Sequence, residues 1–432
     1  MKRMSSVLLA MVMMLAMVLT ACNSSSETKG SGDSSEGGSS GSKSGDLEIF
    51  SWWTAGGEAD GLKALMNQFN NKYPDIEVTN AAVAGGAGSN AKAVLATRMQ
   101  GGDPPSTFQV HGGAELMTWV DSSKMANLND MYEENGWNDI FPKELIDLLS
   151  KDGDIYGVPV DIHRGNVFFY NKKIFEDNNI KEPKTYEDFF KAAEKLKSKG
   201  ITPLALGDKN VWPATMLFEN ALLANLGPDQ YRQLWNGDVP FDDPAVKKSA
   251  ETVKKMLGYV NKGHSSLAWQ DAAQMVVDGK AAMTVMGDWA KGFFTSKDLE
   301  PKKDFGWFTS PGTDDMFMVI NDSFGLPKGV ENPDNVKKFL KVLASKESQV
   351  KFNQLKGSIP ARTDIDHSKF DVYAQETMDD FSSASLTPSL AHGSAAPEGF
   401  ATKANQAVNI FVTQKNVDQL IQSLQQASSQ LK

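Results

Sequence analysis

The chain has 432 residues, of which 41% are hydrophobic and 23% charged, values typical of a globular protein. Its 54 acidic residues outnumber its 44 lysines and arginines and give a net charge of -10, which argues against a nucleic-acid partner. Its single cysteine excludes a disulfide within the chain, so the fold must be stabilised by packing.

The N-terminal segment predicts export. Two basic residues at positions 2 and 3 precede an apolar run over residues 7–19, and Thr-Ala leads into Cys22. This order is typical of a secretory signal peptide. The alternative, a permanent membrane helix, is disfavoured because the run is too short to span a bilayer comfortably.

The Leu-x-Ala-Cys ending resembles the lipobox of bacterial lipoproteins. The resemblance implies that residues 1–21 are cleaved as a signal peptide and that the thiol of Cys22 is acylated, for example with palmitate. The protein is then expected on the outer face of the cytoplasmic membrane. Residues 22–46 are mostly Ser, Gly and scattered charge, so they predict a flexible linker with a reach of about 25–30 Å.

The folded part is predicted to begin at Leu47, and its length suits two domains. Alternating apolar residues predict strands over 47–53, 75–79 and 106–110. Helical spacing of apolar residues predicts helices over 62–69 and 91–99. This order of strands and helices is typical of a parallel, doubly wound sheet with helices on both faces.

The rest of the chain predicts a second set of elements. Residues 157–170 hold two β-rich stretches split by the polar run 161–164, which suits a chain that crosses between lobes. Helices are predicted over 184–200, 245–262, 271–278, 336–343 and 417–431, and strands over 201–206, 281–286, 317–320 and 323–326, the last two returning to the first lobe.

A glycine-rich loop follows the second strand. Residues 86–91 match G-x-G-x-x-A, but a dinucleotide site needs this motif after the first strand. The loop can instead offer backbone N–H groups to a neutral polar ligand, or simply turn the chain. No phosphate-loop, zinc-protease, nucleophile-elbow or C-x-x-C motif is present in the sequence, so no cofactor is predicted.

No metal site is predicted either. His111, His163 and His392 are not spaced with another ligand as a local metal pair, although a cluster formed in three dimensions stays open.

Tryptophans stand at predicted strand ends and helix starts. Trp52 and Trp53 end the first strand, Trp269 precedes a helix, and Trp289 follows a buried strand. Flat indole faces suit the C–H faces of a sugar ring, although ordinary core packing is the alternative for each of them. Polar side chains at comparable places suit the hydroxyls of a sugar. These candidates are Glu58, Gln109, His111, Asp288, Asp322 and Lys356.

Several runs resemble the family 1 extracellular solute-binding proteins of ABC importers, the group that contains maltose-binding protein. They are Phe50-Ser-Trp-Trp53, Gly85-Gly-Ala-Gly88, Met99-Gln-Gly-Gly-Asp-Pro-Pro105, Thr107-Phe-Gln-Val-His111, Val158-Pro-Val-Asp-Ile-His-Arg164, Leu234-Trp-Asn-Gly237, Gly279-Lys-Ala-Ala282, Val285-Met-Gly-Asp-Trp289, Asp322-Ser-Phe-Gly-Leu-Pro327 and Leu355-Lys-Gly-Ser-Ile359. Gln-Val-His, Ile-His-Arg and Leu-Lys-Gly-Ser-Ile are similar to the glucose-, galactose- and mannose-binding members in particular.

The resemblance implies a fold of two doubly wound α/β lobes with the ligand cleft between them, as in class II periplasmic binding proteins. The expected lobes are residues 47–164 plus 319–362 and residues 165–318 plus 363–432. The resemblance also implies a monomer without catalytic residues that closes on a monosaccharide and delivers it to the permease of an ABC importer.

The implied ligand contacts come from both lobes. The first lobe is expected to contribute Trp52 or Trp53, Glu58, Gln109, His111, Asp322 and Lys356, the second Trp269, Trp289 and His392, with His163 near the crossover. Alternatives are an oligosaccharide-binding protein, an exported glycoside hydrolase that uses Glu58, Asp288 and Asp322, and a peptide- or metal-binding lipoprotein.

Overall fold

The computed structural model describes residues 47–431, which belong to one compact unit. The predicted signal peptide, Cys22 and the 22–46 linker lie outside the described residues. Within the described part of the chain, no helix is both long enough and apolar enough to cross a membrane.

One sheet, here called the N-terminal sheet, has the strand order β2-β1-β3-β13-β6. Its strands are β1 (Leu47–Phe50), β2 (Val78–Asn80), β3 (Thr107–His111), β6 (Val158–Pro159) and β13 (Asp322–Phe324). Strand β1 is parallel to β2 and β3, which confirms the doubly wound order expected for the first part of the chain. Strand β13 is antiparallel to β3 and β6, so the complete sheet is mixed.

A second sheet, the C-terminal sheet, has the order β11-β8-β10-β9. Its strands are β8 (Val167–Asn171), β9 (Thr202–Ala205), β10 (Ala281–Val285) and β11 (Phe305–Thr309). Only β9 and β10 are parallel, because β8 is antiparallel to both β10 and β11.

A third sheet, here called the connecting sheet, has the strand order β14-β7-β12-β15. Its strands are β7 (Asp161–Arg164), β12 (Met316–Ile320), β14 (Ile359–Pro360) and β15 (Ser385–Pro388). Through β7 the chain passes from β6 to β8, and through β12 it returns to β13. The strands predicted over 317–320 and 323–326 are both present, but only β13 joins the N-terminal sheet, because β12 pairs with β7 and β15. The two-residue strands β4 (Ser150–Lys151) and β5 (Asp154–Ile155) form a small ladder of their own.

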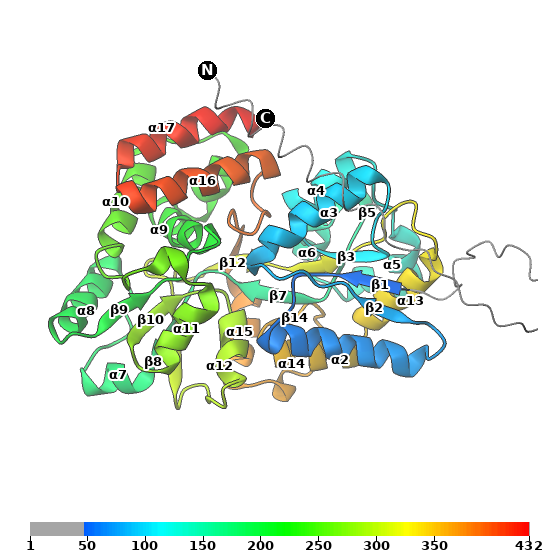
Figure 1. Cartoon of the computed structure of the whole chain (residues 1–432), viewed down its shortest axis with the longest axis horizontal. Helices are drawn as coiled ribbons and strands as arrows, with labels where there is room; N and C mark the ends of the chain where they lie inside the picture. The colour runs from blue at the N-terminus through cyan, green and yellow to red at the C-terminus, as the bar shows by residue number, and fades with distance from the viewer. Residues whose placement is uncertain (1–46, 432) are drawn as a thin grey trace, which may run out of the picture. The chain divides into compact units, whose positions relative to one another are not determined.

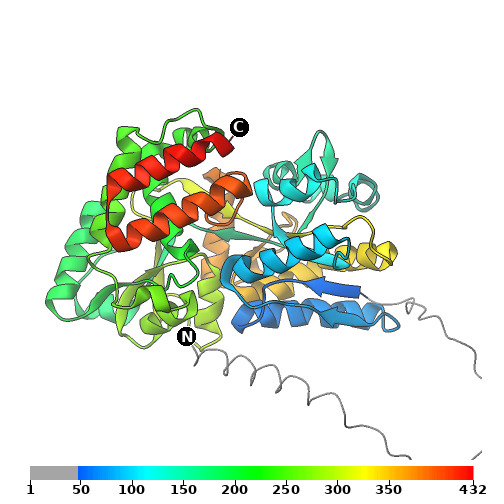
Figure 2. The same cartoon turned by 45° about the horizontal axis from the view of Figure 1, so that its top comes forward.

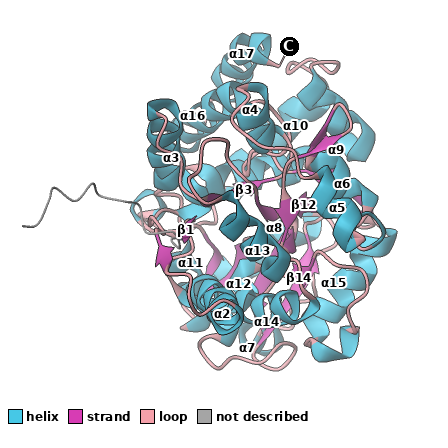
Figure 3. Cartoon of the chain, turned by 90° about the vertical axis from the view of Figure 1, so that its right-hand side faces the viewer, coloured by secondary structure: helices cyan, strands magenta, loops and turns pink. Residues whose placement is uncertain are grey.

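Helices surround the strands (Figure 3). Near the N-terminal sheet in Figure 1 lie α2 (Gly56–Lys72), α3 (Ser89–Gly101), α4 (Ala114–Asp121), α5 (Asn129–Asn135), α6 (Lys143–Leu148), α13 (Pro333–Leu343) and α14 (Lys346–Lys356). The other helices are α7 (Lys172–Asp177), α8 (Tyr186–Ser198), α9 (Trp212–Asn236), α10 (Pro244–Met256), α11 (Trp269–Val277), α12 (Trp289–Thr295), α15 (Val372–Ser383), α16 (Glu398–Gln414) and α17 (Val417–Ala427). Helices α16 and α17 run side by side at the end of the chain (Figure 2).

Helix α9 was not predicted from the sequence. Most of its residues are buried, so it lacks the one-sided apolar stripe by which a surface helix is recognised. It is also kinked at Gly227, which has φ +72° and precedes Pro228. A proline inside a helical pattern is ordinarily a sign that the helix ends there.

Separate hydrophobic clusters stabilise the main sheets. Phe50, Phe108 and Phe324 of the N-terminal sheet pack with apolar side chains of α2 and α13. Phe168 and Met283 of the C-terminal sheet belong to a second cluster with apolar side chains of α8, α9 and α16. A third cluster contains the tryptophans at the starts of α9, α11 and α12, which also line the candidate site.

Candidate functional site

A narrow cavity lies where ends of strands and helices from both main sheets meet. The space between its walls is about 340 Å³ when the open solvent at its mouth is included, and only about 20 Å³ of it is free for the centre of a water-sized sphere. It is lined by Trp52, Glu58, Ala87, His111, His163, Trp212, Trp269, Trp289, Ile320, Asp322, Lys356 and His392. Nine of the twelve predicted ligand-binding residues are among them.

Strand register explains why three of these residues meet. Trp52 follows β1 and His111 ends β3, and the carboxyl ends of parallel strands lie at the same edge of a sheet. Asp322 begins the antiparallel strand β13 and is paired with His111, so it lies at that same edge. Polar and aromatic groups separated by up to 270 residues therefore line one wall.

Three tryptophans form the facing wall. Trp212, Trp269 and Trp289 are the first residues of α9, α11 and α12. Crevices for ligands in α/β proteins form at the carboxyl ends of strands, where helices begin. Each of these side chains is 7% exposed or less, as is Trp52, so the cavity is shielded from water.

Aromatic rings from the two walls approach one another. The ring of Trp289 lies 5.1 Å from that of His392 and 5.2 Å from that of His163, measured between centroids. His392 lies 5.5 Å from His111, which in turn lies 5.0 Å from Trp52. The cavity is therefore bounded by rings that contact each other across it.

Two glycines allow the tryptophans to take these positions. A Cβ atom at Gly88, which has φ +74°, would lie 2.7 Å from the Trp52 ring, and one at Gly287 would lie 2.2 Å from the Trp289 ring. Any side chain there would push an indole ring into the cavity. The glycine-rich loop singled out in the sequence thus supports Trp52, in line with the interpretation that it is not a dinucleotide motif.

Buried charges form the floor of the cavity. Lys356 forms an ion pair with Asp322 and lies 3.3 Å from Oδ2 of Asp161. His163 lies between carboxylates, since its Nε2 is 3.1 Å from Oδ2 of Asp161 and its Nδ1 bonds Asp288. None of these five side chains is more than 2% exposed as a residue. Burial of this kind is stable only because each charge has a partner.

The ion pairs between these buried groups determine the pKa values of His163 and Asp322. Burial by itself would lower the pKa of His163, but Asp161 and Asp288 raise it well above its usual value, so the imidazole is charged. Burial would raise the pKa of Asp322, but Lys356 and His163 hold it well below its usual value. Burial does dominate at Glu58, which also lines the cavity, and raises the pKa of its carboxyl to about 7.

Asp161, His163 and Asp322 bring enough ligand atoms together to hold a metal ion. The ammonium group of Lys356 lies against both of these carboxylates and supplies the positive charge they need. A divalent ion would have to displace this ammonium group, because the carboxylate oxygens that could bind the ion already pair with Lys356.

Three predicted ligand contacts lie behind the lining rather than on it. Trp53 is 1% exposed and packs in the N-terminal core, with the ammonium group of Lys356 4.3 Å from its ring centre. Gln109 accepts a hydrogen bond from the backbone N–H of Trp52 at 3.1 Å and donates one to Asp322 at 2.6 Å. Asp288 holds His163 and accepts a bond from the backbone N–H of Arg164. Gln109 and Asp288 therefore orient residues that line the cavity.

Sequence reasoning missed Trp212, Ala87 and Ile320. Trp212 had a recognisable signal, because it starts a helix soon after a strand, as the other tryptophans do. The indole N–H of Trp212 is buried and, among the described residues, has no hydrogen-bond partner.

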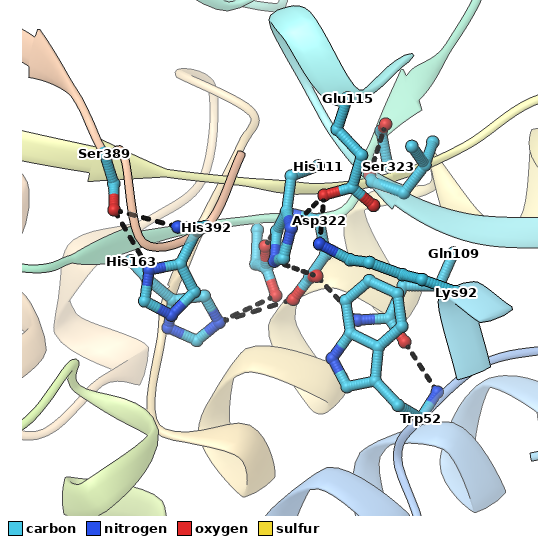
Figure 4. A network of polar contacts seen from close by, with 12 residues as sticks. Trp52, Lys92, Gln109, His111, Glu115, His163, Asp322, Ser323, Ser389 and His392 are labelled. Carbon is cyan, nitrogen blue, oxygen red and sulfur yellow. Dashed lines mark hydrogen bonds and ion pairs between the residues drawn. The ribbon is translucent and has the colours of Figure 1, made fainter. Parts of the chain in front are cut away.

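His111 and His392, which both line the cavity, differ in their hydrogen-bond partners (Figure 4). His111 bonds Glu115 through Nδ1 at 2.8 Å, and Glu115 also pairs with Lys92 at 2.7 Å. His392 bonds the hydroxyl of Ser389 through Nδ1 at 3.0 Å, while its buried Nε2 has no partner in the described part of the chain. Burial and the nearby His111 lower the pKa of His392 well below its usual value, so this ring is neutral.

This arrangement suits binding better than hydrolysis. A glycoside hydrolase needs two available carboxyl groups across the sugar. Asp322 is tied to Lys356 and Asp288 to His163, which leaves Glu58 as the one carboxyl of the three without such a tie among the described residues. Indole faces with a few convergent polar groups in a dry pocket are instead typical of a site that holds a small polar ligand.

Comparisons with known proteins agree with this site. Residues 55–350 match the family of bacterial extracellular solute-binding proteins. An ABC transporter extracellular-binding protein of Pyrococcus horikoshii is 38% identical over 421 residues, 96% of this chain and 94% of the relative. A probable sugar-binding periplasmic protein of Rhizobium meliloti is 33% identical over 363 residues, 81% of this chain and 85% of the relative.

A solved structure establishes the same fold. The bacterial solute receptor AcbH, reported to prefer β-D-galactopyranose exclusively, superposes with a TM-score of 0.80 over 90% of this chain and 98% of its own, at 22% identity. This match confirms the expected α/β periplasmic-binding-protein fold. The hydrolase alternative is set aside, because this family is non-enzymatic. The chain belongs to the bacterial extracellular solute-binding proteins and is a non-enzymatic member of that family.

Proposed function

We propose that this protein captures one monosaccharide of the glucose, galactose or mannose type in the cavity and delivers it unchanged to its permease. The observation that carries the proposal is the small, nearly closed cavity walled by Trp52, Trp212, Trp269 and Trp289. Even with the open solvent at its mouth included, the space between its walls is about 340 Å³, which is short of what a chain of several sugar units needs. An oligosaccharide remains the second candidate, because a cavity between two moving parts can widen.

Two lobes are proposed to close around the sugar, one of residues 47–164 plus 319–362 and one of residues 165–318 plus 363–432. The separate sheets and hydrophobic clusters support this division for most of the chain, while Ile365, Phe370, Ala374 and Met378 of the second lobe pack with the cluster of the first. The close ring contacts across the cavity suit a closed form. A sugar that touches both walls stabilises closure, because it has more contacts in the closed than in the open state.

The roles proposed for the lining residues follow from their chemistry. Trp52 and Trp289, on opposite walls, are suited to cover the faces of a sugar ring, with Trp269 beside them. Charged and neutral polar groups would bond the hydroxyls: Glu58, His111, His163, Asp322, Lys356 and His392.

Cys22 is proposed to anchor the protein to the outer face of the cytoplasmic membrane, with residues 22–46 as a tether that keeps a monomer near its permease. The lipobox-like ending supports this. Replacing Cys22 with Ser should release the protein from the membrane fraction of the producing cell. Retention of the Cys22→Ser variant at the membrane would contradict the anchor.

Calorimetry tests the ligand. We would titrate the protein with D-glucose, D-galactose, D-mannose, maltose and N,N′-diacetylchitobiose, and follow unfolding in the same panel. A sugar at 100 times its Kd should add about 2.7 kcal/mol to the unfolding free energy. The expected result is one-to-one binding of a monosaccharide. Binding of the disaccharides alone would replace the monosaccharide proposal with the oligosaccharide one.

A further inference from the structure

Glu219 is a buried carboxyl that the site described above does not use. It lies on α9, two turns after the cavity-lining Trp212, and has no exposed surface. It receives three hydrogen bonds from the segment that follows β15. Its Oε2 accepts from the backbone N–H groups of Leu390 at 2.7 Å and Ala391 at 3.1 Å, and its Oε1 accepts from the hydroxyl of Ser389 at 2.9 Å.

The same hydroxyl of Ser389 touches His392. Its oxygen lies 3.0 Å from Nδ1 of His392 and also receives the backbone N–H of His392 at 3.3 Å. Ser389 is fully buried and His392 is 2% exposed. Glu219, Ser389 and His392 thus form a hydrogen-bonded series of side chains. It ends at Nε2 of His392, a buried ring atom that has no partner in the described part of the protein.

Proton counting fixes the direction of these bonds. An ionised carboxylate can only accept, whereas a hydroxyl has one proton to donate and two lone pairs. Burial raises the pKa of Glu219 to about 7, so the carboxyl is ionised above that pH. In that state Ser389 donates its only proton to Glu219 and must accept from Nδ1 of His392. Because the His392 ring is neutral, a proton on Nδ1 leaves a lone pair on Nε2.

We propose that Glu219 and Ser389 are positioning residues which hold His392 in its Nδ1–H form, so that Nε2 accepts a hydrogen bond from a hydroxyl group of the bound sugar. The second half of this statement rests on the proposed function, whereas the first half concerns the protein alone. The ligand must then place a hydroxyl donor, rather than an ether oxygen or a carbonyl group, against His392.

Replacing Glu219 with Gln should reverse the direction of the hydrogen bonds that run from Glu219 through Ser389 to His392, because glutamine has nearly the same shape as glutamate but can donate. The amide oxygen takes the place of Oε2, where it still accepts from Leu390 and Ala391. The amide NH2 then faces Ser389 and donates to it. Ser389 turns its proton toward His392, and the neutral ring must carry its own proton on Nε2.

The ring nitrogens of His392 report the result directly. We would record ¹⁵N spectra of the histidine rings of the sugar-free protein at pH 8.5, where Glu219 is ionised, since burial raises its pKa to about 7. The other titratable side chains that act on these groups are Tyr231 beside Glu219, and His111, Lys92, Asp322 and His163 near His392. Signals of His392 are assigned by their loss in His392→Asn. The expected pattern is a protonated Nδ1 and a bare Nε2 in the wild type, and the reverse in Glu219→Gln.

Sugar affinity supplies the second measurement. Titration with D-glucose, D-galactose and D-mannose should show binding weakened by roughly tenfold in Glu219→Gln, the effect of about 1.4 kcal/mol. Ser389→Ala, which removes the link itself, should weaken binding similarly. The matched control is Glu194→Gln, an exposed glutamate on α8 that also accepts a hydroxyl bond, from Tyr259 at 3.0 Å, and it should bind as the wild type does.

The outcomes separate this proposal from the proposed function. A wild-type His392 protonated on Nε2, or an unchanged proton position in Glu219→Gln, overturns the positioning role whether or not sugar binds. A wild type that binds none of the three sugars overturns the proposed ligand instead, and the spectra still decide the role of Glu219. Equal affinities of wild type and Glu219→Gln, together with a reversed ring, would refute the contact between Nε2 and the sugar.

Discussion

Gly292 of α12 packs directly against the backbone of Lys356 at the end of α14. A Cβ atom added to Gly292 would lie 2.1 Å from the carbonyl oxygen of Lys356, well inside contact distance. Because α12 begins at Trp289 and α14 ends at Lys356, this approach brings two cavity-lining residues from opposite walls together. A hydrogen in place of a side chain is what allows it.

Gly292→Ala should therefore hold the two walls apart. Sugar affinity is expected to fall by at least about tenfold, which corresponds to about 1.4 kcal/mol, while the melting temperature without sugar changes little. Calorimetry measures the affinity, and small-angle X-ray scattering with and without sugar measures the closure. Gly101→Ala is the control, since that glycine of α3 has no atom within 4 Å of its added Cβ. Equal affinities in the two variants would rule out a role for this contact in closure.

Lys356→Met should destabilise the fold. The change removes the ammonium group that pairs with Asp161 and Asp322 and leaves the imidazolium of His163 to face both buried carboxylates. Breaking a buried ion pair from one side costs about 3–5 kcal/mol. Chemical denaturation at pH 8 measures the loss. The loss should shrink at pH 5, because the two carboxyl groups then take up protons in the folded state. Lys341→Met removes an exposed pair with Glu134 at 3.4 Å and should cost at most about 1 kcal/mol. Equal losses in both variants would contradict the importance of burial.

Adjacent tryptophans should respond differently to truncation. Trp52→Ala is expected to weaken sugar binding by roughly 1–3 kcal/mol, because a large apolar surface leaves the cavity wall. Trp53→Ala should instead lower the unfolding free energy by about 3–5 kcal/mol, because it empties the N-terminal core. Calorimetry and denaturation, run on both variants, separate the effects. A Trp53→Ala protein of normal stability that had lost its sugar would reverse the assignment.

Trp289→Ala and Trp269→Ala should weaken binding by the same roughly 1–3 kcal/mol. Trp307 on β11 supplies the control, because it lies outside the cavity lining. Unchanged affinity in both Trp289→Ala and Trp269→Ala would refute the stacking roles.

Stability should fall as the pH rises from about 4.5 to 7, in part because of Glu58. Burial raises the pKa of this carboxyl from 4.5 to about 7, so the folded state holds its proton more tightly than the unfolded state does. That contribution is complete below pH 4.5 and is lost by the time the pH has passed 7. Glu58→Gln cannot titrate, so its unfolding free energy, measured without sugar, should decline less over this range. A steeper decline in Glu58→Gln would contradict the sign.

Local patterns in the sequence were enough for much of the fold. Alternating apolar residues predicted β1 and β3, and the spacing of apolar residues predicted α2 and α13, because a half-buried element repeats with its own period. Helix α9 was not predicted, because a helix that is buried on nearly all sides has no contrast between an apolar and a polar face. The pairing of β12 with β7 and β15 was not predicted either, since the sequence of a strand does not indicate which distant strand it pairs with.

The sequence by itself determined which chemistry this protein carries: indole rings at the starts of helices and ends of strands, and polar groups close to them in the chain. Only the tertiary structure decided that Trp52 faces the cavity while Trp53 faces the core, since both lie in the irregular segment after β1, where no strand or helix period fixes which way a side chain points. It also decided that Lys356 neutralises Asp161 and Asp322, and that Glu219 reaches His392 through Ser389. Lys356 is 34 and 195 residues from its two carboxylates, and Glu219 is 170 residues from Ser389, so these short-range contacts exist only after the chain has folded.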